Sequence, residues 1–240
     1  MNENEISNGI IVAISNAAKN YTCFFWYGEY GAEENVGTGT LIKHGNDFYI
    51  LTCEHVATEF FKSENAIIAL GNAEYLDSSE AKYFRKSKRD DLALLKLKDS
   101  KKLGNLSPKT ISDFAFKNLN TDHEALYYLC GFPAEEVKAI ENKRDFKGFT
   151  YFAVSINKMC TKNKLYLEYD KSDSKYPLPA PKGCSGSLIF EYINPSSAQR
   201  KGKIWYPTLG KAVSVEHKSD SNTYIIGTTV RMLKWWLKLS

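Results

Sequence analysis

One serine in the sequence is flanked by glycines in a way that suits a nucleophile. Ser185 lies within Gly183–Gly186 (GCSG), and the apolar segment Ser187–Phe190 follows it. Gly183 can adopt backbone angles that other residues resist, so N–H groups beside the serine can converge on one point. Convergent N–H donors are what an oxyanion hole needs to stabilise the charge on an attacked carbonyl. The same letters also occur in a tight turn before a strand, so the motif alone leaves both interpretations open.

A serine hydroxyl needs a neighbouring base to become nucleophilic at neutral pH, and histidine is the usual base. The sequence contains four histidines. His44 lies in an expected hairpin loop, His123 in a polar connection, and His217 just after an expected strand. His55 follows the apolar segment Phe48–Cys53 at the point where the chain turns, which favours it as the base. A structural role for an isolated histidine at that place is the alternative.

The base in turn needs an acid that orients it. Asp90 and Asp91 directly precede the apolar run Leu92–Leu97. Asp91 adjoins the run, so we expect its side chain to be buried and hydrogen-bonded, whereas we expect Asp90 to be solvated. Polar residues precede strands in many proteins, so each signal is modest by itself. Their occurrence together in the order His55, Asp91, Ser185 is what points to nucleophilic catalysis.

Short apolar runs between polar loops predict the elements that carry these side chains. Thr40–Lys43 and Asp47–Thr52 form a predicted hairpin around Lys43–Asn46. Further strands are expected at Tyr21–Tyr27, Ala66–Leu70, Leu92–Leu97, Ala125–Cys130, Tyr151–Ile156, Leu165–Tyr169, Ser187–Tyr192, Ala212–Val215 and Tyr224–Ile226. Many short strands and few helical patterns indicate an all-β sandwich or barrel.

Helical spacing of apolar residues occurs near the two ends of the chain. It predicts a helix over Val230–Leu239 and a short helix over the first 19 residues, with a strand at Ile10–Ala13 as the alternative. The polar stretch Asp99–Asp122 is the best candidate boundary between two halves. The basic run Lys82–Arg89 is interpreted as a solvated loop.

The composition places the chain among ordinary globular proteins. Of its 240 residues 43% are hydrophobic and 25% are charged, which excludes a disordered, collagen-like or coiled-coil protein. The net charge of +4 is too small to indicate a nucleic-acid partner. A nucleic-acid surface would need Lys82–Arg89 together with Trp235 and Trp236, and we expect the tryptophans to pack against a barrel instead.

Several classes of site and location are not indicated. No apolar run reaches the roughly 18 residues that span a bilayer, and Met1–Glu5 lacks the features of a secretory signal, so we expect a cytoplasmic protein without a membrane partner. The five cysteines are widely spaced with no CxxC pair, which indicates reduced, mostly buried thiols. No His/Cys/Asp cluster has ligand spacing, so neither a metal nor a cofactor is expected.

Segments along most of the chain resemble the chymotrypsin-like (trypsin-fold) serine proteases, in particular intracellular bacterial trypsin-like peptidases. In chain order these are Gly37–Ile42 (GTGTLI), Leu51–Val56 (LTCEHV), Asp91–Leu97 (DLALLKL), Tyr128–Pro133 (YLCGFP), Gly183–Ser187 (GCSGS), Leu209–Val215 and Tyr224–Trp236. Seven matches in the right order make coincidence a poor explanation.

The resemblance implies two six-stranded antiparallel β-barrels with a cleft between them. It divides the chain into an N-terminal segment (1–20), a first barrel (21–110) that carries His55 and Asp91, a second barrel (123–228) that carries Ser185, and a C-terminal helix (229–240). In this family the histidine is the general base, the aspartate orients it, and the serine attacks the carbonyl. The N–H groups of Gly183 and Ser185 would form the oxyanion hole. The strand Val213-Ser214-Val215 would pair with an extended substrate peptide.

The implied activity is that of a serine endopeptidase acting on protein or peptide substrates, without nucleic acid, membrane, metal or cofactor. Cys53 and Cys184 depart from the family pattern. An I-V-G-G-like start is not present, so activation by N-terminal cleavage and insertion is not indicated, and ordering of the loop before Ser185 by a regulatory protein partner is one alternative. The loop Tyr176–Pro181 holds no carboxylate, which favours an uncharged specificity pocket, although Glu216 leaves a basic preference open. The alternative function is a catalytically idle protease-fold module that binds a peptide or a partner protein.

Overall fold

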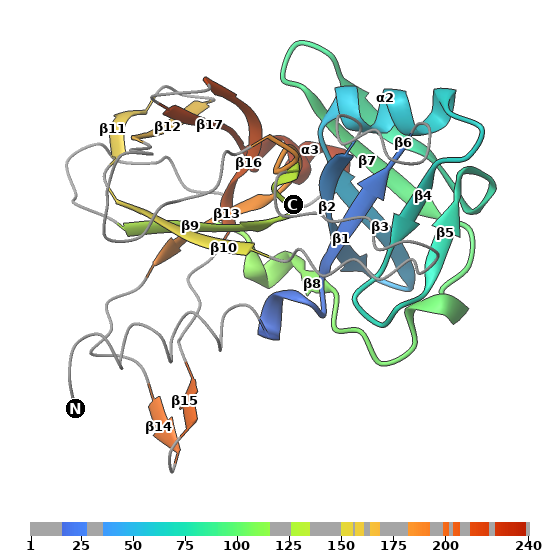
Figure 1. The fold of residues 1–240 in the computed structure, drawn as a ribbon, viewed down its shortest axis with the longest axis horizontal. Helices are drawn as coiled ribbons and strands as arrows, with labels where there is room; N and C mark the ends of the chain where they lie inside the picture. Colours follow the sequence, from blue (N-terminus) through green and yellow to red (C-terminus); the bar gives the residue numbers. More distant parts are fainter. Residues whose placement is uncertain are drawn as a thin grey trace.

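The computed structural model describes residues 16–27, 36–115, 126–134, 150–155, 157–160, 164–168, 182–192, 199–201, 204–206, 212–220 and 224–238. Two large sheets lie side by side, one built from strands of the first half of the chain and one from strands of the second half (Figure 1). Among the described strands, every pairing is antiparallel except that between β2 and β8. The protein is therefore mainly antiparallel β structure, as the sequence predicts.

The first sheet has the strand order β5-β4-β1-β2-β3-β7-β6, and β8 pairs with β2. Its strands are β1 (Thr22–Trp26), β2 (Val36–His44), β3 (Asp47–Thr52), β4 (Ile67–Ala69), β5 (Tyr75–Asp77), β6 (Ala81–Ser87), β7 (Leu92–Leu97) and β8 (Lys109–Thr110). β2 and β3 form the predicted hairpin, in which Lys43 lies opposite Phe48 and His44 opposite Asp47. Gly45 in the turn has a φ of 60°, a conformation that glycine adopts without strain.

The second sheet has the order β10-β9-β13-β16-β17-β12-β11. Its strands are β9 (Leu126–Gly131), β10 (Thr150–Ser155), β11 (Asn157–Cys160), β12 (Lys164–Glu168), β13 (Leu188–Tyr192), β16 (Ala212–Asp220) and β17 (Tyr224–Thr229). β14 (Gln199–Lys201) and β15 (Ile204–Tyr206) pair only with each other among the described strands.

Helices connect and cover the sheets. α2 (Glu54–Lys62) begins directly after β3, and its buried residues Val56, Ala57 and Phe60 recur at helical spacing on the side that faces the core. α3 (Arg231–Trp236) follows β17 near the C-terminus. Three single-turn 3₁₀ helices are η1 (Ser78–Glu80), η2 (Lys101–Leu103) and η3 (Ile111–Asp113). In the described residues, no helix is both long enough and apolar enough to cross a bilayer.

The two halves share their hydrophobic cores at strand β13. Successive side chains of a strand point to opposite faces. Leu188 and Phe190 accordingly pack into the large cluster formed by the first sheet, whereas Ile189 packs into a smaller cluster with residues of β9, β12 and β17. Leu233 and Trp236 of α3 also join the large cluster. The C-terminal helix therefore fastens the second half of the chain to the core of the first.

Several predictions differ from the structure. The described sheets have eight and seven strands, whereas the resemblance implies six in each barrel; the first sheet includes strands of two or three residues, such as β5 and β8, that the sequence pattern does not indicate. The predicted loop Lys82–Arg89 is instead mostly strand β6. Its polar residues face solvent, but Tyr83 packs against Phe61 of α2, with ring centroids 4.8 Å apart. Trp236 is buried as expected, whereas Trp235 is 83% exposed, since neighbouring helical positions face different sides.

The ends and the boundary region are described only in part. Of the helix predicted over the first 19 residues only residues 16–19 are described, with helix at Asn16–Ala18 and a turn after it. Within the predicted boundary Asp99–Asp122 the described residues end at position 115 and include η2, β8 and η3. His123 and the loop Tyr176–Pro181 lie outside the described residues.

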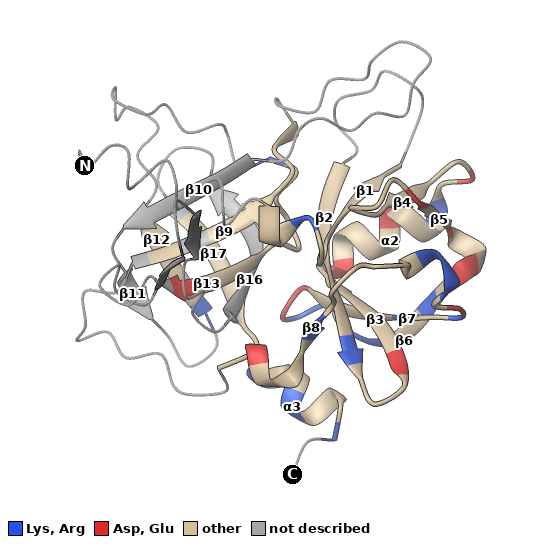
Figure 2. Cartoon of the chain, turned by 90° about the horizontal axis from the view of Figure 1, so that it is seen from below, with Lys and Arg blue, Asp and Glu red and all other residues tan. Residues whose placement is uncertain are grey.

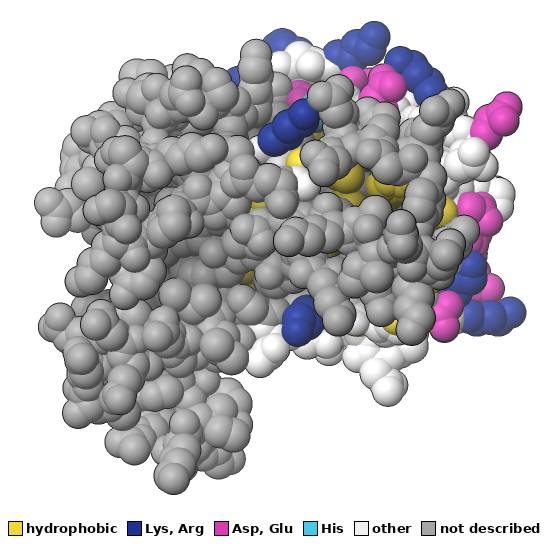
Figure 3. All heavy atoms as spheres, in the orientation of Figure 1, with side chains coloured by type: hydrophobic (Ala, Val, Ile, Leu, Met, Phe, Trp, Pro, Cys, Tyr) yellow, Lys and Arg dark blue, Asp and Glu magenta, His cyan; other side chains and the backbone are white. Residues whose placement is uncertain are grey.

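Charged side chains of both signs are mixed over the first half of the molecule. Figure 2 shows basic and acidic residues alternating around α2 and the neighbouring strands, and Figure 3 shows the same mixture along the outer rim. Lys96 pairs with Asp47 at 2.7 Å and Lys102 with Glu80 at 2.8 Å. Such exposed pairs contribute at most about 1 kcal/mol each. The basic residues counted in the sequence are therefore interleaved with acidic ones on this half.

Candidate active site

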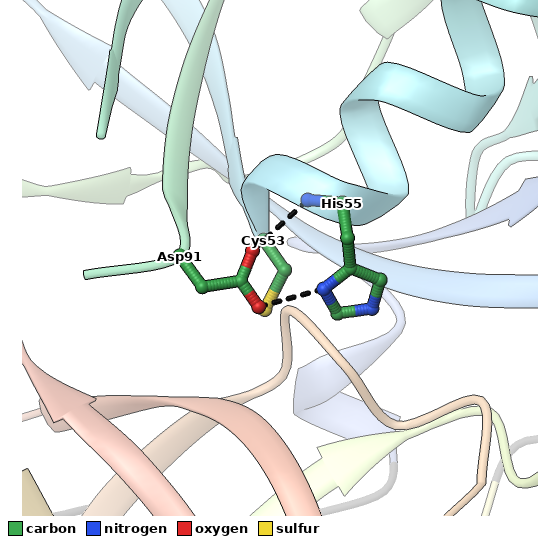
Figure 4. Close-up of side chains that lie close together, drawn as sticks. All are labelled: Cys53, His55 and Asp91. Carbon is green, nitrogen blue, oxygen red and sulfur yellow. Dashed lines mark hydrogen bonds and ion pairs between the residues drawn. The ribbon is translucent and has the colours of Figure 1, made fainter. Parts of the chain in front are cut away.

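His55 and Asp91 meet at the N-terminus of helix α2 (Figure 4). His55 is the second residue of the helix, and its ring Nδ1 lies 2.6 Å from Oδ2 of Asp91. Its backbone N–H donates to Oδ1 of the same carboxylate at 2.9 Å. One carboxylate therefore fixes both the backbone and the ring of the histidine.

The sequence at the start of α2 explains why this carboxylate is needed there. The first N–H groups of a helix have no partner within the helix, and a Ser, Thr, Asp or Asn side chain usually caps them. Cys53 occupies the capping position and makes no side-chain cap hydrogen bond. Asp91 supplies the acceptor from a distant part of the chain, and the positive end of the helix dipole favours its ionised form.

Asp91 is held in a conformation that most residues avoid. It is 8% exposed, and its φ of 48° lies in the left-handed region. Aspartate tolerates that region better than most residues, but the backbone must still be held in place. The Asp91 N–H donates to the carbonyl of Lys88 at 3.3 Å, and the buried Thr228 hydroxyl donates to the carbonyl of Asp90 at 2.8 Å. Strand β17 of the second sheet thus supports the residue directly before Asp91.

Asp90 is not solvated, contrary to the prediction. It is 6% exposed, and its carboxylate accepts a hydrogen bond from Ser87 Oγ at 2.7 Å. The reason is the turn that joins β6 to β7, which folds Ser87 back onto Asp90. The two neighbouring carboxylates therefore have separate partners, and only Asp91 faces His55.

Thr38 on strand β2 connects the serine loop to the histidine side of the site. Its N–H donates to the Ser185 carbonyl at 2.8 Å and its hydroxyl donates to the Gly183 carbonyl at 2.9 Å. Its own carbonyl accepts a hydrogen bond from the Thr52 hydroxyl at 2.7 Å. Thr52 ends β3, three residues before His55. The Ser185 backbone is thereby fixed to the strands that lead into His55 and α2.

Two glycines shape the serine loop. Gly183 has a φ of 90° and Gly186 a φ of 98°, angles that side-chain-bearing residues rarely adopt. A Cβ atom on Gly186 would overlap the Thr38 carbonyl and would lie 2.5 Å from Thr52 Oγ1. The loop can approach strand β2 this closely only because position 186 has no side chain.

The peptide groups beside Gly183 have defined orientations. The Lys182 carbonyl accepts a hydrogen bond from the Ala134 N–H at 2.7 Å. Because the trans peptide is planar, the Gly183 N–H points away from Ala134, to the opposite side of the chain. The Gly183 carbonyl is likewise turned to Thr38. Both carbonyls are therefore hydrogen-bonded to neighbouring protein groups.

Exposure separates Ser185 from its neighbours. Ser185 is partly exposed, whereas Cys184 and Ser187 are completely buried. In this loop, only Ser185 combines a nucleophilic side chain with access to solvent.

The predicted substrate strand lies in β16, and the pairing register of β16 shows where the strand is paired on both sides and where one edge is open. Val215 is opposite Leu188 of β13 and Thr228 of β17, and Ser214 is likewise matched on both sides. In the described residues β16 has no partner on its β13 side beyond Val215, so the open edge of this strand begins at Glu216. The assignment of Val213-Ser214-Val215 as the substrate-binding strand stays a prediction.

Neither Thr38 nor Cys53 is predicted to take part in the site. Thr38 lies between two glycines in an apolar strand, and its partner Gly183 is 145 positions away. The sulfur of Cys53 lies beside the His55–Asp91 pair (Figure 4). His217, a weaker candidate base, lies in β16 at an irregularity of the register.

Comparison with known proteins supports the fold. No known protein family and no curated protein matches the sequence. The structure is similar to the crystal structure of the serine endoprotease from Yersinia pestis, with a TM-score of 0.55 and 16% sequence identity. The similarity covers 98% of this chain and 67% of that chain. The chain therefore has the fold of a trypsin-type serine protease.

Proposed function

We propose that the protein is a serine endopeptidase that hydrolyses peptide bonds of protein substrates. Ser185 is the nucleophile, His55 is the general base and then the general acid, and Asp91 orients the histidine. The observation that carries the proposal is the bidentate Asp91 carboxylate, which holds both the N–H and the ring of His55. The side chain of His55 is half exposed, with 48% of it open to solvent. A histidine that only filled space would not need two hydrogen bonds to one carboxylate to hold such an exposed side chain in place.

The geometry supports a specific tautomer of His55. With Asp91 ionised, the short contact to Nδ1 is a hydrogen bond in which Nδ1–H donates to the carboxylate. The lone pair of Nε2 is then left to accept the Ser185 proton as the hydroxyl attacks the substrate carbonyl. The imidazolium that forms is stabilised by Asp91 and returns the proton to the leaving amine. N–H groups of Gly183 and Ser185 stabilise the oxyanion.

The substrate is an extended peptide that adds to the sheet edge of β16 from Glu216 onward. Backbone hydrogen bonds along such an edge are independent of side-chain identity, which suits an enzyme that acts on protein chains. A regulatory protein partner that contacts the loop before Ser185 would act on the same bonds that fix Lys182 and Gly183. We further propose that the protein works in the cytoplasm, in keeping with four buried cysteines that form no disulfide.

A fluorophosphonate probe tests the activity without knowledge of the substrate. We expect covalent labelling of the wild type at Ser185, no labelling of Ser185→Ala, and much slower labelling of His55→Ala. Ser187→Ala is the matched control, because Ser187 is a buried serine two positions away and should leave labelling intact. Profiling a peptide library with wild type and Ser185→Ala then identifies the cleavage preference. A folded wild type that neither reacts with the probe nor cleaves any denatured protein would instead indicate a catalytically idle module that binds a peptide or partner.

A further inference from the structure

A third potential metal ligand lies against the His55–Asp91 pair. The sulfur of Cys53, a ring nitrogen of His55 and a carboxylate oxygen of Asp91 all lie within 4.8 Å of one another (Figure 4). Cys53 is completely buried beneath the pair, and Asp91 is nearly so, whereas His55 is exposed. A thiol, an imidazole and a carboxylate are the three side-chain types that bind Zn²⁺ in proteins.

We propose that Cys53, His55 and Asp91 form a site for a thiophilic divalent cation such as Zn²⁺, and that occupation of this site switches the peptidase off. The regulatory part of this inference rests on the proposed function, whereas the binding part does not. Three protein ligands and one water would complete the tetrahedral coordination that Zn²⁺ prefers.

The movements required are small. Metal–ligand bonds of about 2.0–2.3 Å place tetrahedral ligands roughly 3.3–3.8 Å from one another. The His55–Asp91 contact of 2.6 Å must therefore open by about 1 Å, and the sulfur must approach by a similar amount. Rotation of the half-exposed His55 side chain about its own bonds can open the His55–Asp91 contact. The backbone N–H of His55 can keep its bond to the other Asp91 oxygen throughout.

The positions of the protons explain why metal binding would block catalysis. The Cys53 thiol releases its proton to solvent and binds as a thiolate. Nδ1 of His55, the ring nitrogen that faces Asp91, can bind the metal only after it loses its own proton. The neutral ring then carries its single proton on Nε2. In that tautomer Nε2 has no lone pair to accept the Ser185 proton, so the base is lost although the triad residues are intact.

Metal binding is measured directly by ultraviolet spectroscopy. We expect Cd²⁺ added to the reduced wild type to produce a thiolate-to-metal charge-transfer band that saturates at one equivalent. The band should disappear in Cys53→Ala and in Cys53→Ser, the second of which keeps the volume of the side chain. Cys23→Ala is the matched control, because Cys23 of β1 is an equally buried, reduced cysteine outside the site and should retain the band. Circular dichroism verifies that each variant is folded.

Inhibition is measured on the same variants. Zn²⁺ should slow fluorophosphonate labelling of the wild type, EDTA should restore it, and Cys53→Ala should need at least tenfold more Zn²⁺ for the same effect. A folded wild type without the charge-transfer band, or a band that persists in Cys53→Ala, would overturn the metal site whatever the activity. A charge-transfer band that is lost in Cys53→Ala, in a protein that never reacts with the fluorophosphonate probe, would support the metal site and refute the peptidase activity. Equal Zn²⁺ sensitivity of wild type and Cys53→Ala would refute the regulatory role.

Discussion

Replacing Asp91 by asparagine tests the central feature of the site with minimal change of shape. The carboxylate accepts two hydrogen bonds, one from the His55 N–H and one from its ring. An asparagine has one acceptor oxygen and one NH₂ donor group. If the oxygen keeps the backbone N–H at the start of α2, the NH₂ group faces Nδ1, which must then accept. The ring is forced to carry its proton on Nε2, the nitrogen that should receive the proton of Ser185.

The size of the effect follows from this change of tautomer. A triad histidine held in the wrong tautomer reduces turnover by about 10⁴-fold, or about 5.4 kcal/mol of transition-state stabilisation. The fold should tolerate the substitution, because asparagine accepts the left-handed backbone of position 91 as well as aspartate does. We expect the free energy of unfolding to fall by no more than about 2 kcal/mol, the range for one weakened charge-assisted hydrogen bond.

The assay is the rate of fluorophosphonate labelling at neutral pH, with urea unfolding to measure stability. Asp90→Asn is the control, because Asp90 is an equally buried neighbouring carboxylate whose partner is Ser87 rather than His55. We expect it to label within about threefold of the wild-type rate, far above Asp91→Asn. Labelling of a folded Asp91→Asn at more than about a tenth of the wild-type rate would refute the role that we give to Asp91.

Two further predictions concern the stability of the fold. Gly186→Ala should destabilise the protein by about 3 kcal/mol or more and slow labelling, because φ is 98° and the new Cβ would meet Thr52 Oγ1 at 2.5 Å. The control Gly45→Ala, at a position with a φ of 60° and open space around it, should cost only about 1 kcal/mol. Equal losses of unfolding free energy in the two variants would contradict the role given to Gly186. Burial raises the pKa of Cys130 from 9.0 to about 12 and that of Tyr27 from 10.0 to about 12, so the unfolded chain loses these protons first. The contribution of these two groups to the unfolding free energy is complete below about pH 9 and should decline above it, by up to about 1.4 kcal/mol per pH unit for each group. An unfolding free energy that stays constant from about pH 8 to 11 would show that these groups are not buried in the folded state.

Elements with a strong local signal could be predicted from the sequence. Strands β3 and β7 have apolar runs that end at turn residues, and their observed bounds are the predicted ones, whereas β2 begins four residues before its predicted start. Strand β6 could not be predicted, because its sequence is basic and its stability comes from tertiary contacts. These are the pairing with β7 and the ring contacts of Tyr83 with Phe61 and of Phe84 with Tyr49. Helix α2 also has no counterpart among the predicted elements. It is nine residues long and receives its cap from Asp91, 36 positions away from His55.

The residues of the candidate site likewise include some that the sequence indicates and others that only the structure shows. His55, Asp91 and Ser185 could be proposed from the sequence because each has a short sequence context of its own. The side chains that hold them together have no such context. Thr38 acts through bonds to residues in the other half of the chain, and the importance of Cys53 depends on where the turn after β3 places its sulfur. Residue type and spacing thus indicate the reacting groups, whereas their supports depend on tertiary contacts.

The arrangement of these supports has a consequence for how activity can be controlled. The first half of the chain supplies both members of the His55–Asp91 pair, through α2 and the turn before β7, and Thr228 of β17 adds one hydrogen bond to the carbonyl of Asp90. The second half contributes Ser185, and its loop is fixed to the first sheet through Thr38, a completely buried residue whose N–H, hydroxyl and carbonyl are all hydrogen-bonded. A partner that loosens or tightens the loop therefore changes the position of the nucleophile and of the Gly183 N–H together, without disturbing the base. A cation bound at Cys53 would do the opposite, since it disables the base and leaves the loop in place. The two kinds of control act on different halves of the molecule and can be told apart, because only the first changes the contacts of Thr38.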